Sequence, residues 1–221
     1  TGPDSESVER QRTRNQDEIA TPKRHPWAGD FYEGDGLGAN IRVSLAPGTG
    51  IAATWHGCLG LYGANRGKVV ERDGELRFEY EEPNEQGFGG FPDALRPIRW
   101  GERRYMIPET KLIDFVNAIN HGFEPRKQIH GMYLLADGDE KRPVAGLPEL
   151  PKPMRDLIRR QALEVRIVLV DAAETRKSET GSDCGFHYRM TLDRGARDGL
   201  APGVELKVIG QAHIWDNVTV A

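Results

Sequence analysis

The sequence predicts a mainly β protein with two short helices, built as an antiparallel meander barrel or sandwich plus a small C-terminal β-barrel-like part. Short segments in which apolar and polar residues alternate recur along the chain, as expected for strands with one buried face. Turn-forming residues separate these segments, with Gly 26 and Pro 14 spread through the sequence rather than repeated. Strands at this spacing are typical of a barrel or a sandwich.

The first folded part is expected over residues 25–150, as an antiparallel β-meander with one helix. Ile41, Val43 and Leu45 alternate with polar residues, which is the period of a half-buried strand. The Asp73-Gly74 pair between two alternating segments predicts a tight hairpin. Further strands are expected at 51–55, 59–62, 69–70, 76–80, 98–100, 105–107 and 129–135.

One helix is expected to interrupt the meander between Pro108 and Gly122, because proline favours the start of a helix and glycine the position past its end. Its apolar residues fall on one face, and this face should cover a barrel end or one side of a sheet. They are Leu112, Phe115, Val116 and Ile119.

The two ends of the chain differ from this central part. Residues 1–24 are charged and almost free of large apolar side chains, which predicts a flexible N-terminal linker or a loosely docked helix. Four prolines between positions 143 and 153 indicate an extended connector. Residues 151–221 are therefore expected to form a small β-rich C-terminal domain, which opens with a short helix near Met154.

A glycine-rich turn lies in the C-terminal part. Gly195, Gly199 and Gly203 stand between two alternating segments, so residues 186–209 should form two strands joined by a loop. At least one of these glycines should have a positive φ, and Leu200 should point into the small core as the only large apolar side chain of the loop.

This turn resembles a unit of bacterial envelope proteins. The rod-shape-determining and flagellar-assembly families use similar glycine-spaced turns between strands, and the resemblance implies a small β-barrel and a location in the cell envelope. The residues that carry it are Leu192-Asp193-Arg194-Gly195, Asp198-Gly199-Leu200 and Pro202-Gly203-Val204.

The first folded part is similar in style to lipocalin-like exported meander barrels. It opens with Trp27, Gly29, Phe31 and Tyr32, whereas lipocalins place a glycine and a tryptophan on the first strand to close the barrel floor. The resemblance implies an exported barrel protein with a small apolar ligand.

Charge and hydropathy restrict the class of protein further. The 30 basic and 34 acidic residues give a net charge of -4, and nucleic-acid binders usually show a basic excess, so no nucleic-acid partner is expected. No apolar run approaches the roughly 20 residues needed to span a bilayer, so no transmembrane segment is expected. The chain begins with Thr1 rather than Met, which we interpret as removal of a leader, with a trimmed sequence as the alternative. We therefore expect an exported protein of the periplasm or cell envelope, with residues 1–24 as a tether that links a leader or lipid anchor to the folded part.

Four aromatic residues form the candidate ligand-binding site. Phe88, Phe91, Trp100 and Tyr105 lie near a glycine-rich segment and could line the mouth of a pocket for a small apolar ligand. The alternative is that they are ordinary core residues.

Cys58 is the candidate nucleophile of an alternative enzymatic function. With His56 two positions earlier, it could serve a hydrolase whose base is a histidine brought near by folding. A disulfide between Cys58 and Cys184 and two buried, inert thiols are the other interpretations of the cysteines.

No metal or cofactor site is expected. The six histidines lack ligand spacing, and the acidic loop around Asp30, Glu33 and Asp35 does not fit a calcium-binding loop. The sequence therefore predicts a non-enzymatic exported or envelope protein that binds a partner protein or a small apolar ligand.

Overall fold

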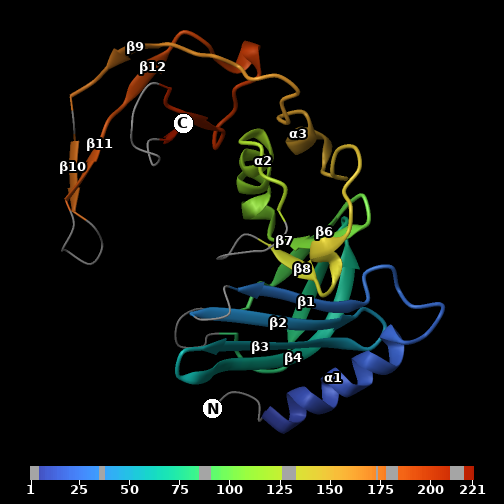
Figure 1. Ribbon diagram of the computed structural model, residues 1–221. Helices are drawn as coiled ribbons and strands as arrows, with labels where there is room; N and C mark the ends of the chain where they lie inside the picture. The colour runs from blue at the N-terminus through green and yellow to red at the C-terminus, as the bar shows by residue number, and fades with distance from the viewer. Residues whose placement is uncertain are drawn as a thin grey trace. The chain divides into compact units, whose positions relative to one another are not determined.

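The computed structural model describes residues 5–34, 38–84, 91–125, 133–172, 174–177, 184–209 and 217–221 (Figure 1). The chain divides into two compact units, residues 1–155 and 156–221. The sequence-based boundary falls slightly earlier, after residue 150, within the proline-containing connector. This connector continues into a one-turn helix, α3 (Lys152–Arg155), which belongs to the first unit.

The first unit contains a closed antiparallel barrel of eight strands. Each strand pairs with the next along the chain, and β8 returns to pair with β1. This barrel confirms the predicted mainly β class and fits a lipocalin-like meander. The strands are β1 (Gly29–Gly34), β2 (Ala39–Ala46), β3 (Gly50–Gly57), β4 (Gly60–Arg72), β5 (Glu75–Tyr80), β6 (Ala94–Trp100), β7 (Arg103–Ile107) and β8 (Leu134–Ala136).

The interior of the barrel is filled by one apolar cluster that receives side chains from every strand except β4 as fully buried members, with Val69 of β4 packed against it. The alternation that the sequence predicts decides which residues enter it. Val43 and Leu45 of β2 are buried in the cluster, whereas Arg42 is exposed on the opposite face of the strand.

The hairpin between β4 and β5 has the geometry that its sequence predicts. Asp73 and Gly74 have φ angles of 54° and 74°, and the flanking residues Arg72 and Glu75 are paired. A two-residue turn of type I′ requires positive φ at both central positions, which explains the Asp-Gly pair.

Helix α1 (Ser5–Ile19) packs along the outer wall of the barrel against β2, β3 and β4 (Figure 1). Val8 is fully buried against Ala52 and Ala64, two small side chains that let the helix approach the strands closely. Asn15 is also fully buried, and its Nδ2 donates a 2.8 Å hydrogen bond to the backbone oxygen of Ser44.

This docked helix corresponds to the second of the two interpretations of residues 1–24, the docked helix, and differs from the flexible linker. That prediction rested on the scarcity of apolar residues, but the buried face of α1 is largely polar. Gln11 donates hydrogen bonds to Asn15 Oδ1 at 2.9 Å and to the Thr49 carbonyl at 3.3 Å. Polar side chains can be buried when they are hydrogen-bonded in this way, and apolar periodicity does not reveal such a face.

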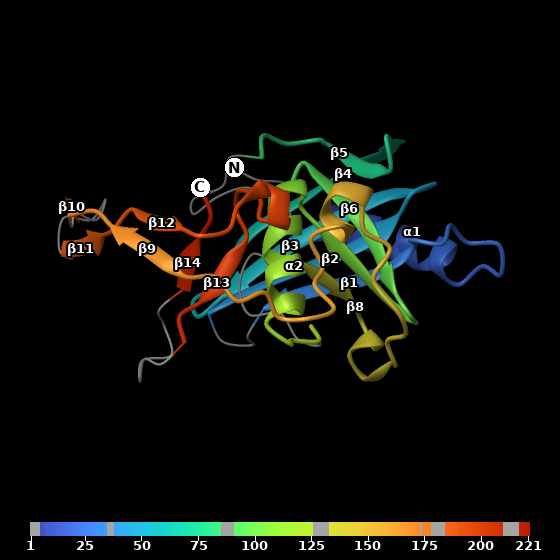
Figure 2. The ribbon, with the colours of Figure 1, turned by 90° about the horizontal axis from the view of Figure 1, so that it is seen from above.

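A second helix, α2 (Leu112–Asn120), follows the short 3-10 helix η1 (Glu109–Lys111). Leu112, Phe115 and Val116 are fully buried, as predicted, and Ile119 is half-buried. Phe115 makes edge contacts with the rings of Trp100, Tyr105 and Tyr133, at centroid distances of 6.3, 5.2 and 5.6 Å. The helix therefore covers an aromatic face formed by Trp100 of β6, Tyr105 of β7 and Tyr133, which precedes β8. Seen from above, α2 lies over the barrel strands (Figure 2).

A buried arginine ties the segments that follow α2 to the barrel. Arg103 on β7 is fully buried and forms an ion pair with Glu124. Its guanidinium also donates hydrogen bonds to the carbonyl oxygens of Pro125, at 3.3 Å, and Arg142, at 2.6 Å. Arg142 directly follows the 3-10 helix η2 (Asp139–Lys141), so one side chain holds two loops against the outer wall.

The second unit is β-rich, as predicted, and its described residues form three two-stranded antiparallel sheets. These pair β9 (Ile167–Val170) with β12 (Met190–Leu192), β10 (Glu174–Lys177) with β11 (Cys184–His187), and β13 (Glu205–Lys207) with β14 (Asn217–Thr219).

The glycine-rich turn joins β12 to β13, as the sequence predicts, although these two strands pair with β9 and β14 rather than with each other. Gly199 and Gly203 have φ angles of 80° and 87°, and Leu200 is buried. A single turn of 3-10 helix, η3 (Ala196–Asp198), precedes Gly199. The Gly195 N–H donates to Asp198 Oδ2 at 3.0 Å and holds the pKa of that carboxyl below its ordinary value.

We expect Phe115→Ala to lower the free energy of unfolding by about 3–5 kcal/mol, because it removes a fully buried ring and its three aromatic contacts. Chemical denaturation measures this change. Ile113→Ala on the less buried side of the same helix is the matched control, with a smaller loss. An equal effect of both substitutions would show that α2 does not depend on this face.

We expect Gly199→Val to destabilise the second unit by at least about 1 kcal/mol, because a β-branched residue is strained at positive φ. A Cβ at this position would also lie 2.7 Å from the Arg159 guanidinium. Gly195→Val is the control, since Gly195 has an extended backbone and no heavy atom within 4 Å of the added Cβ. Hydrogen exchange of the amides in β12 and β13 measures both effects, and equal protection in the two variants would contradict the turn assignment.

Candidate functional site

The structure separates the aromatic residues that the sequence analysis grouped as a ligand-binding site. Phe91 belongs to the apolar cluster inside the barrel and lies against Tyr80, with ring centroids 6.2 Å apart. Asn84 holds it there through hydrogen bonds to its backbone nitrogen, at 2.9 Å, and its carbonyl, at 2.6 Å. Phe88 lies outside the described residues.

Trp100 and Tyr105 instead belong to the aromatic cluster under α2. Both are buried, at 7% and 0% exposure. Trp100 Nε1 donates to the Gly146 carbonyl at 3.0 Å, and the Tyr105 hydroxyl donates to the Pro125 carbonyl at 2.6 Å. Burial raises the pKa of Tyr105. These contacts show how the two residues hold α2 and the neighbouring loops, and they do not join Phe91 in a common mouth.

Cys58 lies in the two-residue turn between β3 and β4, where its side chain is exposed. The expectation of a buried thiol is therefore wrong for Cys58, because the strand pair ends one residue earlier. His56 is exposed near the end of β3. The ring of Tyr62 approaches Gly57 so closely that a Cβ there would lie 2.0 Å from it, which explains the glycine between the two candidate residues.

The two cysteines lie on different units, Cys58 in the first and Cys184 on β11 of the second. The side chain of Cys184 is not among those that the structure describes. A bridge between them, and the hydrolase alternative based on Cys58, therefore stay predictions.

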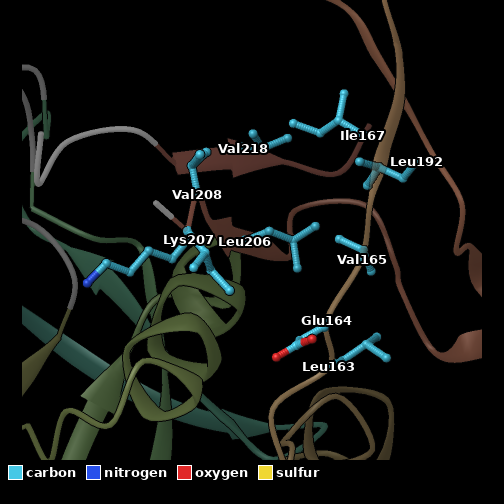
Figure 3. Close-up of a pocket in the computed structure, with 10 residues that line it drawn as sticks. Leu163, Glu164, Val165, Ile167, Leu192, Leu206, Lys207, Val208 and Val218 are labelled. Carbon is cyan, nitrogen blue, oxygen red and sulfur yellow. The ribbon is translucent and has the colours of Figure 1, made fainter. Parts of the chain in front are cut away.

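A groove in the second unit is the apolar depression that we take as the candidate binding site. Its volume is about 230 Å³. Figure 3 shows Leu206 and Val218, from the β13–β14 sheet, directed toward Ile167 and Leu192 of the β9–β12 sheet. We call it the C-terminal groove. Its lining residues are Leu163, Glu164, Val165, Ile167, Leu192, Leu206, Lys207, Val208, Ile209 and Val218.

The charged residues of the C-terminal groove lie at its margin. The Lys207 side chain extends away from the apolar side chains, and Glu164 stands beside the half-buried Leu163 and Val165 (Figure 3). The floor can therefore offer dispersion contacts and exclusion of water, which is the chemistry of binding an apolar group.

Strand β9 borders the C-terminal groove with exposed apolar side chains. Its four consecutive apolar residues, Ile167, Val168, Leu169 and Val170, are 42%, 60%, 56% and 49% exposed. A strand in a two-stranded sheet has no second layer to bury its faces, so both remain accessible. Exposed contiguous apolar surface of this kind marks interaction sites more often than a single exposed side chain does.

The sequence predicts a β-rich C-terminal part but not the C-terminal groove within it. Val165, Ile167 and Leu169 alternate in the sequence, which is typical of a strand with one buried face. Whether such a face is covered depends on the strand's partners and on the size of its sheet. Sequence periodicity indicates neither of these. The uninterrupted apolar run from Ile167 to Val170 was the signal that could have indicated the site, because a strand with one exposed face alternates apolar and polar residues instead.

Comparison with known proteins found no match for this chain among protein-family models, curated proteins or solved structures. The described residues therefore define a class of architecture, a closed eight-stranded antiparallel barrel followed by a small β-rich unit.

The described residues contain neither a metal-binding cluster nor a membrane-spanning helix. Within the described part of the chain, no group of three or more His, Cys, Asp or Glu residues is placed to hold a metal ion. The helices among these residues are all too short or too polar to cross a membrane.

We expect Cys58 to react with a maleimide under native conditions, since its side chain is exposed. The Cys184→Ser variant isolates this thiol, and mass spectrometry compares labelling with and without denaturant. Labelling that requires denaturant would contradict the exposed position. Labelling much faster than that of glutathione at neutral pH would favour the hydrolase alternative, because reactivity follows the thiolate fraction.

Proposed function

We propose that this protein is a non-enzymatic binding protein whose C-terminal groove takes apolar side chains of a partner protein. The observation that carries the proposal is the half-buried apolar floor of the groove, bordered by the four exposed apolar residues of β9. Partners bury such clusters at the centre of an interface, with charged residues at the rim.

The size of the C-terminal groove favours a partner segment over a larger ligand. Its volume of about 230 Å³ lies below the roughly 300–1,000 Å³ of pockets for drug-sized ligands. A groove of this size accommodates a few apolar side chains, and the β9 surface extends the contact beyond it. A small apolar ligand is the alternative occupant.

The proposed location is the periplasm or cell envelope. Its support is the resemblance of the β12–β13 turn to envelope-assembly proteins, together with the positive φ angles at Gly199 and Gly203 that this turn unit uses. Fractionation of cells that express the complete gene product tests the location, and recovery in the cytosolic fraction alone would contradict it.

We expect the protein to bind the apolar dye 1-anilinonaphthalene-8-sulfonate in the C-terminal groove, with an affinity that falls at least about tenfold in Leu206→Asp, because a carboxylate would have to lose hydration inside an apolar contact. Dye fluorescence measures binding. Val70→Asp on β4 is the matched control, because Val70 is an apolar residue 40% exposed in the other unit.

Ile167→Ser is the milder second variant, in case Leu206→Asp disturbs folding of the second unit. Unchanged dye affinity in both groove variants would refute the proposed site. Displacement of the dye by hexan-1-ol, but not by an extended valine- and leucine-rich peptide, would favour the small ligand. The opposite result would support the partner segment.

A further inference from the structure

A small polar cavity lies on the outer wall of the barrel, beside α1. It has a volume of about 130 Å³, and five of its seven lining residues, from four parts of the chain, carry a charged or hydroxyl side chain; the other two are Phe31 and Val43. Arg12 comes from α1, Asp30 from β1, Arg42 and Ser44 from β2, and Asp137 directly follows β8. We call it the wall pocket. It belongs to the first unit and is independent of the C-terminal groove.

Contacts with other residues hold three of the charged groups in place. Gln16 Nε2 donates to both carboxylate oxygens of Asp30, at 3.0 and 2.8 Å. The Arg12 guanidinium donates to Thr54 Oγ1 at 3.2 Å and forms an ion pair with Glu9 at 2.9 Å. The Arg42 guanidinium lies 5.2 Å from the centre of the Tyr32 ring. The wall pocket is therefore a built feature of the α1–barrel contact.

The Ser44 hydroxyl is the group in the wall pocket that lacks a partner. Ser44 is 1% exposed, and its Oγ has no hydrogen-bond partner within the described part of the chain. Its backbone oxygen is already bound to Asn15. A buried hydroxyl without a hydrogen bond is costly, so a polar occupant of the pocket gains a favourable contact.

The charges of the wall pocket restrict what that occupant can be. Two carboxylates, Asp30 and Asp137, face the same cavity as two guanidiniums, Arg12 and Arg42. A simple cation would be attracted by the carboxylates and repelled by the guanidiniums. A simple anion would be attracted by the guanidiniums and repelled by the carboxylates. A molecule that carries both charges satisfies both pairs.

The charges around Asp137 favour a positive group next to it. Partial burial is the main cause that raises the pKa of the Asp137 carboxyl; Arg42 lowers it, and the charges of Asp30 and Glu140 raise it further. The backbone N–H of Asp137 also donates to the Asp30 carbonyl at 2.9 Å, which keeps the two acidic residues adjacent. An ammonium group between the carboxylates would relieve their repulsion.

We propose that the wall pocket binds a small zwitterion with one ammonium and one carboxylate, of the α-amino acid class. Asp30 and Asp137 take the ammonium, Arg12 and Arg42 take the carboxylate, and Ser44 donates or accepts the remaining hydrogen bond. The volume of about 130 Å³ exceeds the roughly 10–15 Å³ that one water molecule needs. It also lies well below that of a drug-sized pocket, so the ligand is among the smallest of its class.

Titration of the ¹⁵N-labelled protein with glycine tests the proposal. We expect saturable chemical-shift changes at the amides of Asp30, Ser44 and Asp137, and binding at least about tenfold weaker for acetate or methylammonium at equal ionic strength, because each offers only half of the charge match. No saturable change with glycine would show that the pocket holds water only and would overturn the proposal. Equal binding of acetate would show an anion site, and equal binding of methylammonium a cation site, and either result overturns it too.

Two variants test whether the chemical-shift changes come from glycine bound in the wall pocket rather than from general effects of glycine on the protein. Ser44→Ala removes the unpartnered hydroxyl with little change of volume, and Asp137→Asn removes one carboxylate charge at an exposed rim position. Each should weaken glycine binding at least about tenfold. Glu79→Gln on β5, which also removes one exposed carboxylate, should leave it unchanged. Equal glycine binding in all three variants overturns the proposal.

Discussion

The pairing of β1 with β8 is the constraint on which the first unit depends. It places Phe31 opposite Ala136 and Tyr32 opposite Leu135, so residues from both ends of the barrel sequence meet. Closing so long a stretch of chain costs conformational entropy, which the apolar interior must offset. Closure also removes the free edges that an open sheet would expose. The wall pocket lies beside this seam, since Asp30 and Asp137 flank the paired residues.

Two helices cover the outer wall by different chemistry. Helix α2 uses an apolar face, with Phe115 packed against three aromatic rings, and its position follows from hydrophobic burial. Helix α1 uses small apolar contacts at Val8 and hydrogen bonds from the buried Asn15 and Gln11. A polar contact of this kind is specific in geometry, because each buried donor needs an acceptor at one position. It also creates a polar environment beside the barrel, where the charges of the wall pocket are held.

The second unit leaves apolar side chains accessible, because its two-stranded sheets cannot bury them as a closed barrel does. Two-stranded sheets are marginal in water unless another layer covers them. Ile167 through Val170 remain accessible, and Leu206 and Val218 are only half-buried around the C-terminal groove. The barrel unit thus buries its apolar core inside the closed sheet, whereas the C-terminal unit presents a contiguous apolar strand that a partner can cover. This contrast is why we place the proposed binding function in the C-terminal unit.

Patterns along the chain were enough to predict the elements that depend on neighbouring residues. Alternation at Val43 and Leu45 predicted a strand, Asp73-Gly74 predicted the hairpin, and the apolar face around Phe115 predicted α2. Barrel closure, the docking of α1 and both candidate sites were decided only by tertiary structure. The physical reason is that they depend on which distant residues meet: Asn15 is buried because the Ser44 carbonyl lies within hydrogen-bond reach, and Ile167 is exposed because no third strand covers it in the described sheet. Periodicity and turn chemistry report a residue's neighbours along the chain, not its neighbours in space.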